Sequence, residues 1–234
     1  MCDMLKISQI AKKHQIAVIE DAAQSFGSHR AGFMPGQLSD LACFSFHPLK
    51  NLNASGDGGF IATNDKNLAD RVKSLRNHGL LDRDTVSEFG FVSRLDSIQA
   101  AILKIRLGLT DEILGIRRSI AHIYDAALDE NKIVPPKISG DSFHSYHLYV
   151  IEVANRNFLQ ESLNLVGVQT KIHYPKLICD QPAFLKQFSS YNLDLEETRK
   201  QSKRILSIPV HQHLNAEQIE FVIDQINKLA IPFD

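Results

Sequence analysis

The sequence contains few cysteines and lacks any apolar run long enough to cross a membrane. Its three cysteines, Cys2, Cys43 and Cys179, are widely spaced among 234 residues and form no CxxC pair. This spacing argues against a disulfide framework and a structural zinc site, and it favours a reducing compartment. A membrane span needs about 20 consecutive apolar residues, and the N-terminus lacks the layout of a signal peptide. We therefore expect a cytoplasmic protein with no membrane partner.

The sequence also lacks an excess of either charge. It has 26 lysines and arginines against 27 aspartates and glutamates, for a formal net charge of -1. This balance gives no electrostatic reason to expect nucleic acid as a partner. With 44% apolar and 23% charged residues, the composition is ordinary for a globular protein. The length allows one large domain or two modest ones.

Apolar segments that alternate with helical patterns indicate an α/β fold in the first half of the chain. Residues 17–20, 42–46 and 59–63 are strand candidates. Their consecutive apolar positions are typical of strands buried on both faces. Residues 5–11 and 64–79 have the spacing of amphipathic helices, and the second of these begins with a capping pair and ends at glycine.

A long helical pattern leads from the first half into a second region. It runs from Asp96 to about Glu130, and a bend or break is expected near Gly108 because one ordinary helix is shorter. The second region is predicted to contain strands at 147–153 and 168–174, and helices at 157–166, 198–205 and from Asn215, which starts a capping box. We expect two domains, covering residues 1–120 and 121–234.

Four polar side chains follow two of the predicted strands. Asp21 and Gln24 come after the first strand, and Ser45 and Lys50 come at the end of the next. Ligands of open α/β sheets bind beyond such strand ends. Each residue also has a plainer explanation, since Asp21 could cap a helix and Lys50 could be a surface lysine. Pyridoxal phosphate accounts for all four together, because it needs an amine, an anion, an amide and a small hydroxyl.

Several longer motifs resemble the DegT/StrS-type sugar aminotransferases. They cover essentially the whole chain and read IEDAAQSFGS, CFSFHPLKNLNASGDGGFIATND, SLRNHGL, RLDSIQAAIL, SYHLYVIEV, GVQTKIHYP and SIPVHQHLNAEQIEFVIDQI. The resemblance implies the fold-type I architecture of pyridoxal-phosphate-dependent transferases, which is aspartate-aminotransferase-like. It implies a partial large domain with a mostly parallel sheet, lacking its N-terminal part, followed by a C-terminal α+β small domain.

The resemblance also assigns roles to single residues. Lys50 is implied as the Schiff-base lysine, Asp21 as the partner of the pyridine nitrogen, and Gln24 and Ser45 as contacts of the ring oxygen and phosphate. Residues near the substrate are implied more weakly, at Asn77, Arg94, His173 and Tyr174. No metal site is expected, because the histidines of the VHQH motif have no carboxylate or cysteine close by.

The implied reaction transfers an amino group, from glutamate, to a nucleotide-linked keto-sugar in polysaccharide, lipopolysaccharide or amino-sugar biosynthesis. The assembly implied for full-length family members is a homodimer. One alternative is a truncated, non-catalytic remnant or a cofactor-binding partner subunit. Another is a dehydratase of the same family, which is less favoured because such enzymes have histidine at the position of Lys50.

Two departures from the family pattern stand out. Family members have a further N-terminal stretch with a Gly-Thr/Ser-x-Ala turn that binds the cofactor phosphate, and this sequence contains no counterpart of it. Many members also have asparagine where this chain has Val92. Since valine cannot donate the corresponding hydrogen bond, the resemblance does not extend to that contact between subunits.

Overall fold

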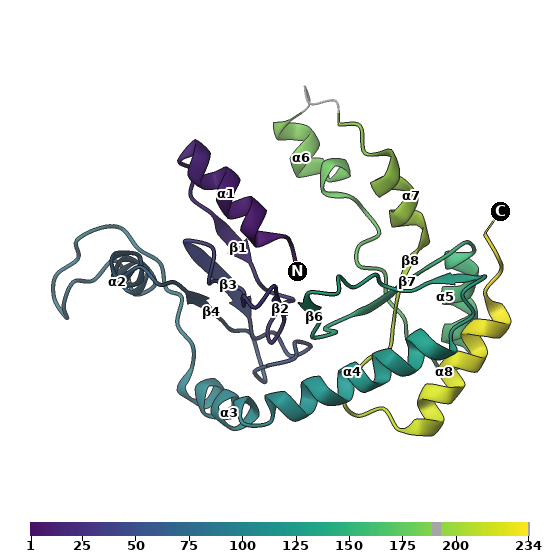
Figure 1. Ribbon diagram of the computed structural model, residues 1–234. Coiled ribbons are helices and arrows are strands. Elements are labelled where there is room, and N and C mark those ends of the chain that lie inside the picture. Colours follow the sequence, from purple (N-terminus) through teal and green to yellow (C-terminus); the bar gives the residue numbers. More distant parts are fainter. Residues whose placement is uncertain (189–192, 234) are drawn as a thin grey trace. The chain divides into compact units, whose positions relative to one another are not determined.

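The computed structural model describes residues 1–188 and 193–233, and the chain divides into two compact units (Figure 1). Unit 1 consists of Met1–Gly115 together with Ile138–His147. Unit 2 consists of Ile116–Lys137 and Leu148–Asp234. The predicted domains at 1–120 and 121–234 stay a prediction. That prediction did not include the return of Ile138–His147 to unit 1.

A three-stranded sheet forms the centre of unit 1. Its strands are β1 (Ile19–Asp21), β3 (Leu41–Ser45) and β4 (Gly59–Ala62), in the order β1-β3-β4. Strands β1 and β3 are parallel, with Asp21 opposite Cys43, and β4 is antiparallel to β3. The three strands fall where the apolar runs of the sequence predict them. The parallel pair ends with Asp21 and Ser45, so two polar side chains reach the same edge of the sheet.

Three helices and a short ribbon complete unit 1. The remaining elements are α1 (Met4–His14), α2 (Lys66–Leu75), α3 (Ser97–Leu107), β2 (His29–Arg30) and β6 (Ser142–Phe143). Asp3 and Asp65 cap α1 and α2 by accepting backbone N–H groups of their first turns. Strand β2 is antiparallel to β6, and this pairing brings residues 138–147 back to the first part of the chain.

The core of unit 1 lies directly behind the segment that follows Lys50. Leu52, Ala54 and Leu103 are buried together, and they pack against Phe26, Phe46 and Leu95. Aromatic rings extend this core along the sheet, since the Phe44 and Phe60 rings stack with centroids 4.3 Å apart. Burial of each large apolar side chain contributes roughly 1.5–3 kcal/mol. The lysine segment is therefore anchored on α3 through Leu103 and on the residue that follows β3, Phe46.

Unit 2 is an antiparallel sheet covered by helices. Its strands are β5 (Ile133–Val134), β7 (Tyr149–Val153) and β8 (Ile205–Ile208), in the order β5-β7-β8. Its helices are α4 (Thr110–Ala127), which begins in unit 1, α5 (Arg156–Leu165), the 3-10 helix η1 (Ile178–Asp180), α6 (Pro182–Gln187), α7 (Glu196–Arg204) and α8 (Ala216–Leu229). Helix α5 contacts both β8 and α8 (Figure 1).

Alternating burial along β7 creates the core of unit 2. Tyr149, Ile151 and Val153 are fully buried, and the residues between them are partly exposed. Leu159 from α5 and Ile226 from α8 are also fully buried. The buried face of the sheet therefore has the period of two that an antiparallel sheet with one covered face requires.

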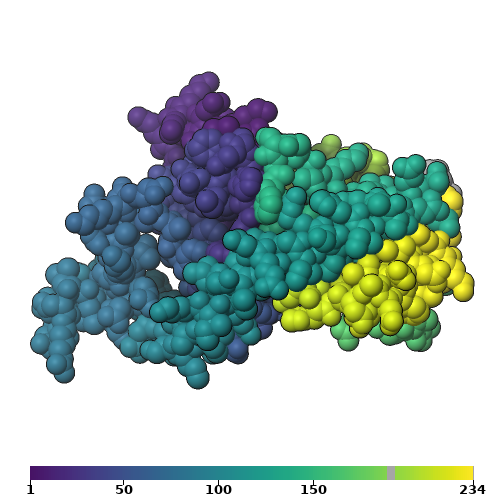
Figure 2. Space-filling view, turned by 60° about the horizontal axis from the view of Figure 1, so that its bottom comes forward, coloured from purple at the N-terminus to yellow at the C-terminus, as the bar shows by residue number. Residues whose placement is uncertain are grey.

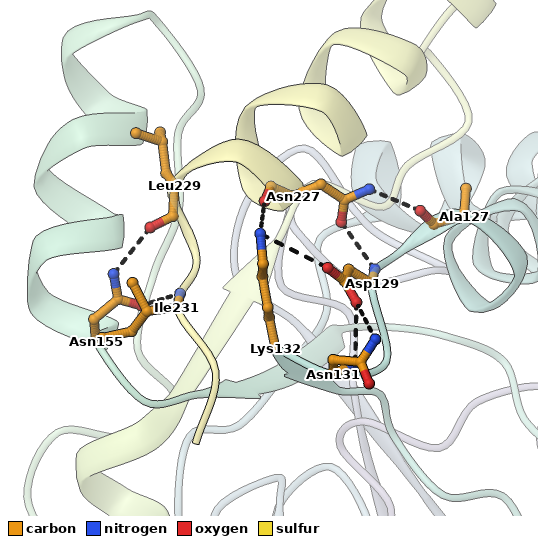
Figure 3. A network of polar contacts seen from close by, with 8 residues as sticks. All are labelled: Ala127, Asp129, Asn131, Lys132, Asn155, Asn227, Leu229 and Ile231. Carbon is orange, nitrogen blue, oxygen red and sulfur yellow. Dashed lines mark hydrogen bonds and ion pairs between the residues drawn. The ribbon is translucent and has the colours of Figure 1, made fainter. Parts of the chain in front are cut away.

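A polar network joins the C-terminal ends of α4 and α8 (Figure 3), which lie side by side (Figure 2). The Asn227 side chain donates to the Ala127 carbonyl (2.8 Å) and accepts from the Asp129 N–H (2.9 Å). Lys132 Nζ donates to the Asn227 carbonyl (2.8 Å), and Asn155 donates to the last carbonyl of α8. Side chains thus satisfy backbone groups that helix ends leave without partners.

Most predicted elements are confirmed, with one error in unit 2. The long helical pattern divides into α3 and α4 at Gly108, as expected. The strand predicted at 168–174 is wrong, because that segment forms only one bridge, between Lys171 and Ser207. Pro175, which follows, has no N–H for a longer ladder. The partner in that bridge lies in β8, a strand that was not predicted.

No helix within residues 1–188 and 193–233 is long and apolar enough to cross a membrane.

Candidate active site

The turn after β1 places Asp21 at the edge of the sheet. Its Oδ1 accepts the N–H of Ala23 (3.0 Å), which is the local hydrogen bond that aspartate uses to start a turn. Gln24 follows on the exposed side of the turn. Gly27 has φ of 78°, and a Cβ there would lie 2.4 Å from a methyl carbon of Leu114. Glycine suits this position because it adopts a positive φ without strain, and any other residue would also displace the Leu114 side chain.

The turn after β3 carries Ser45 and Lys50. The Ser45 Oγ accepts the N–H of His47 (3.2 Å), and the Lys50 N–H donates to the His47 carbonyl (2.8 Å). The N–H of Ala54 then closes a wider loop on the Phe46 carbonyl (2.8 Å). These bonds fold the chain back on itself after Pro48, so that Lys50 becomes half-buried instead of extending into solvent.

Lys50 lies in an environment that disfavours its charged form. Burial lowers the pKa of the Lys50 amine, and the negative charge of Asp21 partly offsets this effect. Asp21 therefore acts on Lys50 through its charge, although the two residues follow different strands. A lysine with a lowered pKa has a larger fraction of free amine at neutral pH, and the free amine is the nucleophile in carbonyl chemistry.

A buried hydrogen-bond network connects the two turns with the segment at 138–147. The Ser28 Oγ donates to the Ser145 Oγ (2.9 Å) and accepts the Ser145 N–H (3.1 Å). The Asn51 Nδ2 donates to the Ser145 carbonyl (2.9 Å). All three residues are at least 94% buried. At the edge of this network, His147 Nε2 lies 3.4 Å from Lys50 Nζ.

Sequence reasoning missed this network. Asn51 is adjacent to Lys50, and Ser145 and His147 belong to the SYHLYVIEV motif. Both segments are part of the family resemblance, but the sequence does not indicate that they contact each other. Their juxtaposition depends on the pairing of β2 with β6, two strands of two residues each. Elements this short give no periodic signal in a sequence.

Two of the weaker candidates lie in the segment between α2 and α3. Asn77 forms a bridge with Val92, and Arg94 is exposed. Val92, the position that departs from the family pattern, is 64% exposed. The roles of Asn77 and Arg94 toward a substrate stay predictions.

The other two candidates lie in unit 2. His173 Nδ1 is 2.8 Å from the Ser207 Oγ, which fixes the orientation of the imidazole ring. Tyr174 is 62% exposed. Asp21, Gln24, Ser45 and Lys50, in contrast, all lie in unit 1. A substrate role for His173 and Tyr174 also stays a prediction.

Comparison with known sequences identifies sugar aminotransferases as relatives. The chain is 39% identical over 228 residues to dTDP-3-amino-3,6-dideoxy-alpha-D-galactopyranose transaminase of Aneurinibacillus thermoaerophilus, covering 97% of this chain and 62% of that protein. It is 37% identical to UDP-2-acetamido-2-deoxy-3-oxo-D-glucuronate aminotransferase of Pseudomonas aeruginosa, covering 94% of this chain and 60% of that protein. The chain therefore spans about three fifths of the length of these relatives.

Comparison with solved structures gives the same assignment. The S. venezuelae DesV structure in complex with a ketimine intermediate matches with a TM-score of 0.93 and 34% identity, over 100% of this chain and 63% of DesV. The Bacillus subtilis NtdA structure with bound cofactor PMP matches with a TM-score of 0.88 and 31% identity, over 98% of this chain and 54% of NtdA. The expected α/β fold of fold-type I transferases is thereby confirmed. Because residues 1–227 match the DegT/DnrJ/EryC1/StrS aminotransferase family, this chain belongs to that family.

Proposed function

We propose that this chain takes part in pyridoxal-phosphate-dependent transfer of an amino group from glutamate to a nucleotide-linked keto-sugar. The main support is the half-buried Lys50 amine, whose pKa is lowered by burial and which interacts with Asp21. Relatives named as transaminases and aminotransferases of UDP- and dTDP-linked sugars give the substrate class. Because the chain covers only 60–62% of those relatives, the activity has to be measured on the chain itself.

The side chains at the sheet edge fit this cofactor chemically. When bound, pyridoxal phosphate supplies an aldehyde and a ring that accepts electrons from a deprotonated substrate. Asp21 offers a carboxylate to the ring nitrogen, Gln24 an exposed amide to the ring oxygen, and Ser45 a hydroxyl to the phosphate. The Asn51 Oδ1 is buried and has no hydrogen-bond partner within the described chain, so this edge also retains acceptor capacity.

Each proposed role follows from the local chemistry. Lys50 would hold the cofactor through its amine and, once released, would move a proton at the substrate carbon. Its lowered pKa suits both tasks, because both need the neutral amine. Asp21 would keep the ring nitrogen protonated, since a nearby negative charge favours the protonated form of a base.

Covalent capture of the cofactor tests the proposal. The purified chain is incubated with pyridoxal phosphate, reduced with sodium borohydride and digested, and the modified peptides are identified by mass spectrometry. We expect modification at Lys50 in the wild type and none at that peptide in Lys50→Ala. Lys73→Ala is the matched control, because Lys73 is an exposed lysine of α2. A folded wild-type chain without modification at Lys50 would contradict cofactor binding.

The amino transfer itself is tested with isotope-labelled glutamate. We expect 2-oxoglutarate to appear when glutamate is added to the loaded protein, and labelled nitrogen to enter a UDP- or dTDP-linked keto-sugar. A sugar that loses oxygen without gaining nitrogen would indicate a dehydratase. A protein that captures the cofactor but releases no 2-oxoglutarate would be a cofactor-binding remnant.

We also propose that the chain forms a homodimer. Unit 1 exposes several large apolar side chains in the segment between β4 and α4, namely Phe89, Phe91, Val92, Ile98 and Ile105. Apolar side chains that gather into a large exposed patch mark interaction surfaces. A second copy of the chain would cover this surface. Light scattering coupled to gel filtration should give twice the monomer mass, and Phe91→Asp should shift the mass toward the monomer.

A cytoplasmic location is the remaining part of the proposal. It is supported by the three cysteines, which form no disulfide in the described residues, because disulfides are rare in reducing compartments. Fractionation of cells that express the tagged chain should recover it with cytoplasmic enzymes.

A further inference from the structure

His147 contacts the lysine site from a distant part of the sequence. It lies 97 residues after Lys50, and its Nε2 is 3.4 Å from the Lys50 Nζ. This distance allows a hydrogen bond between the amine and the imidazole. The proposed function gives no role to this histidine.

The position of His147 is fixed by several contacts of the segment that carries it. The Phe143 ring stacks on His29, with centroids 5.0 Å apart and planes 11° from parallel. Ser145 is fully buried and bonds both Ser28 and Asn51. The segment is thus attached to the turn that bears Asp21 and to the turn that bears Lys50, so the contact with Lys50 is part of a built arrangement.

We propose that His147 is a positioning residue for Lys50, holding the amine by accepting a hydrogen bond from its ammonium form. The role in amino transfer rests on the proposed function, whereas the effect on Lys50 can be measured without cofactor. Accepting at Nε2 requires the proton of the neutral imidazole to be on Nδ1.

The groups around Lys50 predict whether the His147 acceptor raises or lowers the pKa of the Lys50 amine. Asp21 is the charged neighbour that favours the ammonium, and burial opposes it. A neutral imidazole that accepts a hydrogen bond also favours the ammonium, because a bond to the charged form stabilises that form. A protonated imidazole would repel it. The favourable effect belongs to the neutral imidazole, because only that form has a ring nitrogen able to accept a hydrogen bond.

Competitive labelling of the cofactor-free protein tests this role. The rate of acetylation of Lys50 by trace acetic anhydride is followed by mass spectrometry across pH, which gives the pKa of that one amine. We expect His147→Phe to lower the pKa of Lys50 by about one unit, since a hydrogen bond to a charged group contributes roughly that much. His147→Gln should restore it toward the wild-type value, because the amide oxygen is again an acceptor.

The controls separate positioning from general loss of structure. His122→Phe changes an exposed histidine of α4 and should leave the titration of Lys50 unchanged. If His147→Phe fails to fold, His147→Asn provides the test, since its shorter side chain withdraws the acceptor. The same pKa of Lys50 in the wild type and in a folded variant without the acceptor overturns the role of His147.

The outcome is independent of the proposed function. A wild type that captures no pyridoxal phosphate, but whose Lys50 titration shifts in His147→Phe, overturns the cofactor proposal and keeps the positioning role. If the wild type captures pyridoxal phosphate normally and the titration of Lys50 does not shift in His147→Phe, the positioning role is overturned and the cofactor proposal is kept.

Discussion

Asp21 combines a structural and an electrostatic task in one side chain. Its Oδ1 accepts the N–H of Ala23, and its charge acts on Lys50. Asparagine keeps a carbonyl oxygen for the turn and removes the charge. We therefore expect Asp21→Asn to fold normally, to lower the pKa of Lys50 further, and to reduce amino transfer by roughly 100-fold or more through loss of the ring-nitrogen partner.

Labelling of Lys50 and single-turnover kinetics with glutamate measure these two effects. Asp70→Asn is the control, because Asp70 is an exposed residue of α2 that pairs with Lys73 on the same helix. Equal turnover in Asp21→Asn and the wild type would contradict the assignment of Asp21 to the ring nitrogen.

His211 predicts a pH dependence of stability in unit 2. Burial, followed by the positive charges of Arg117 and His213, lowers the pKa of His211 below its ordinary value of 6.5. Its Nδ1 also accepts the N–H of His213, which needs the neutral ring. The unfolded chain therefore binds the proton more readily, and stability falls as the pH drops below about 6.5 through the folded pKa.

Thermal unfolding between about pH 5 and pH 7.5 measures this dependence. The melting temperature should decrease toward pH 5 in the wild type and decrease less in His211→Gln. His122→Gln should retain the wild-type dependence, because His122 is exposed. A steeper loss in His211→Gln than in the wild type would show that the sign is wrong.

Single residues were predictable where they stand at the ends of recognisable strands. Asp21, Ser45 and Lys50 follow apolar runs that the structure confirms as β1 and β3. Ser145 and His147 were not recognised as parts of the lysine site, because their proximity to Lys50 is created by tertiary structure alone. No local propensity reports a contact between residues 97 positions apart.

At the scale of elements, the ends of α4 and α8 stabilise each other through one side chain. Asn227 supplies partners to the Ala127 carbonyl and the Asp129 N–H (Figure 3). Asn227→Ala removes both bonds, and the two backbone groups lose their side-chain partner. We expect the free energy of unfolding to decrease by about 1–3 kcal/mol, which is the usual cost of such groups when they are poorly solvated.

Chemical denaturation with guanidinium chloride gives this free energy. Lys228→Ala, at the next and exposed position of α8, should change it by less than about 0.5 kcal/mol. Equal stabilities of Asn227→Ala and Lys228→Ala would mean that water replaces the Asn227 side chain without cost.

Elements with strong local signals were predicted well. The capping box of α8 is present as expected, with Asn215 and Gln218 each bonding the other's backbone N–H. The failures concern short strands at sheet edges. Strand β8 was missed because its residues continue an apparent helix, and its conformation is decided by pairing with β7.

At the scale of the whole molecule, the sequence predicted the fold class and the family but not the course of the chain between the units. Residues 116–137 belong to unit 2, residues 138–147 return to unit 1, and the chain then re-enters unit 2. A prediction from the sequence alone places a single domain boundary, at the point where the residue pattern changes. The return depends on the two-residue strand β6 and on the contacts of Ser145. Neither gives a sequence pattern long enough to be recognised.

This return has a consequence for protein synthesis. A nascent chain that has emerged only to residue 137 already contains Asp21, Ser45 and Lys50, but it lacks the partners that Ser28, Asn51 and Lys50 find in the next ten residues. Domains tend to fold on the ribosome as their sequence becomes complete. Unit 1 can therefore complete the lysine site only after residues 138–147 have emerged, which happens after α4 has been synthesised. Until then, a chaperone would bind unit 1 in an incompletely folded state.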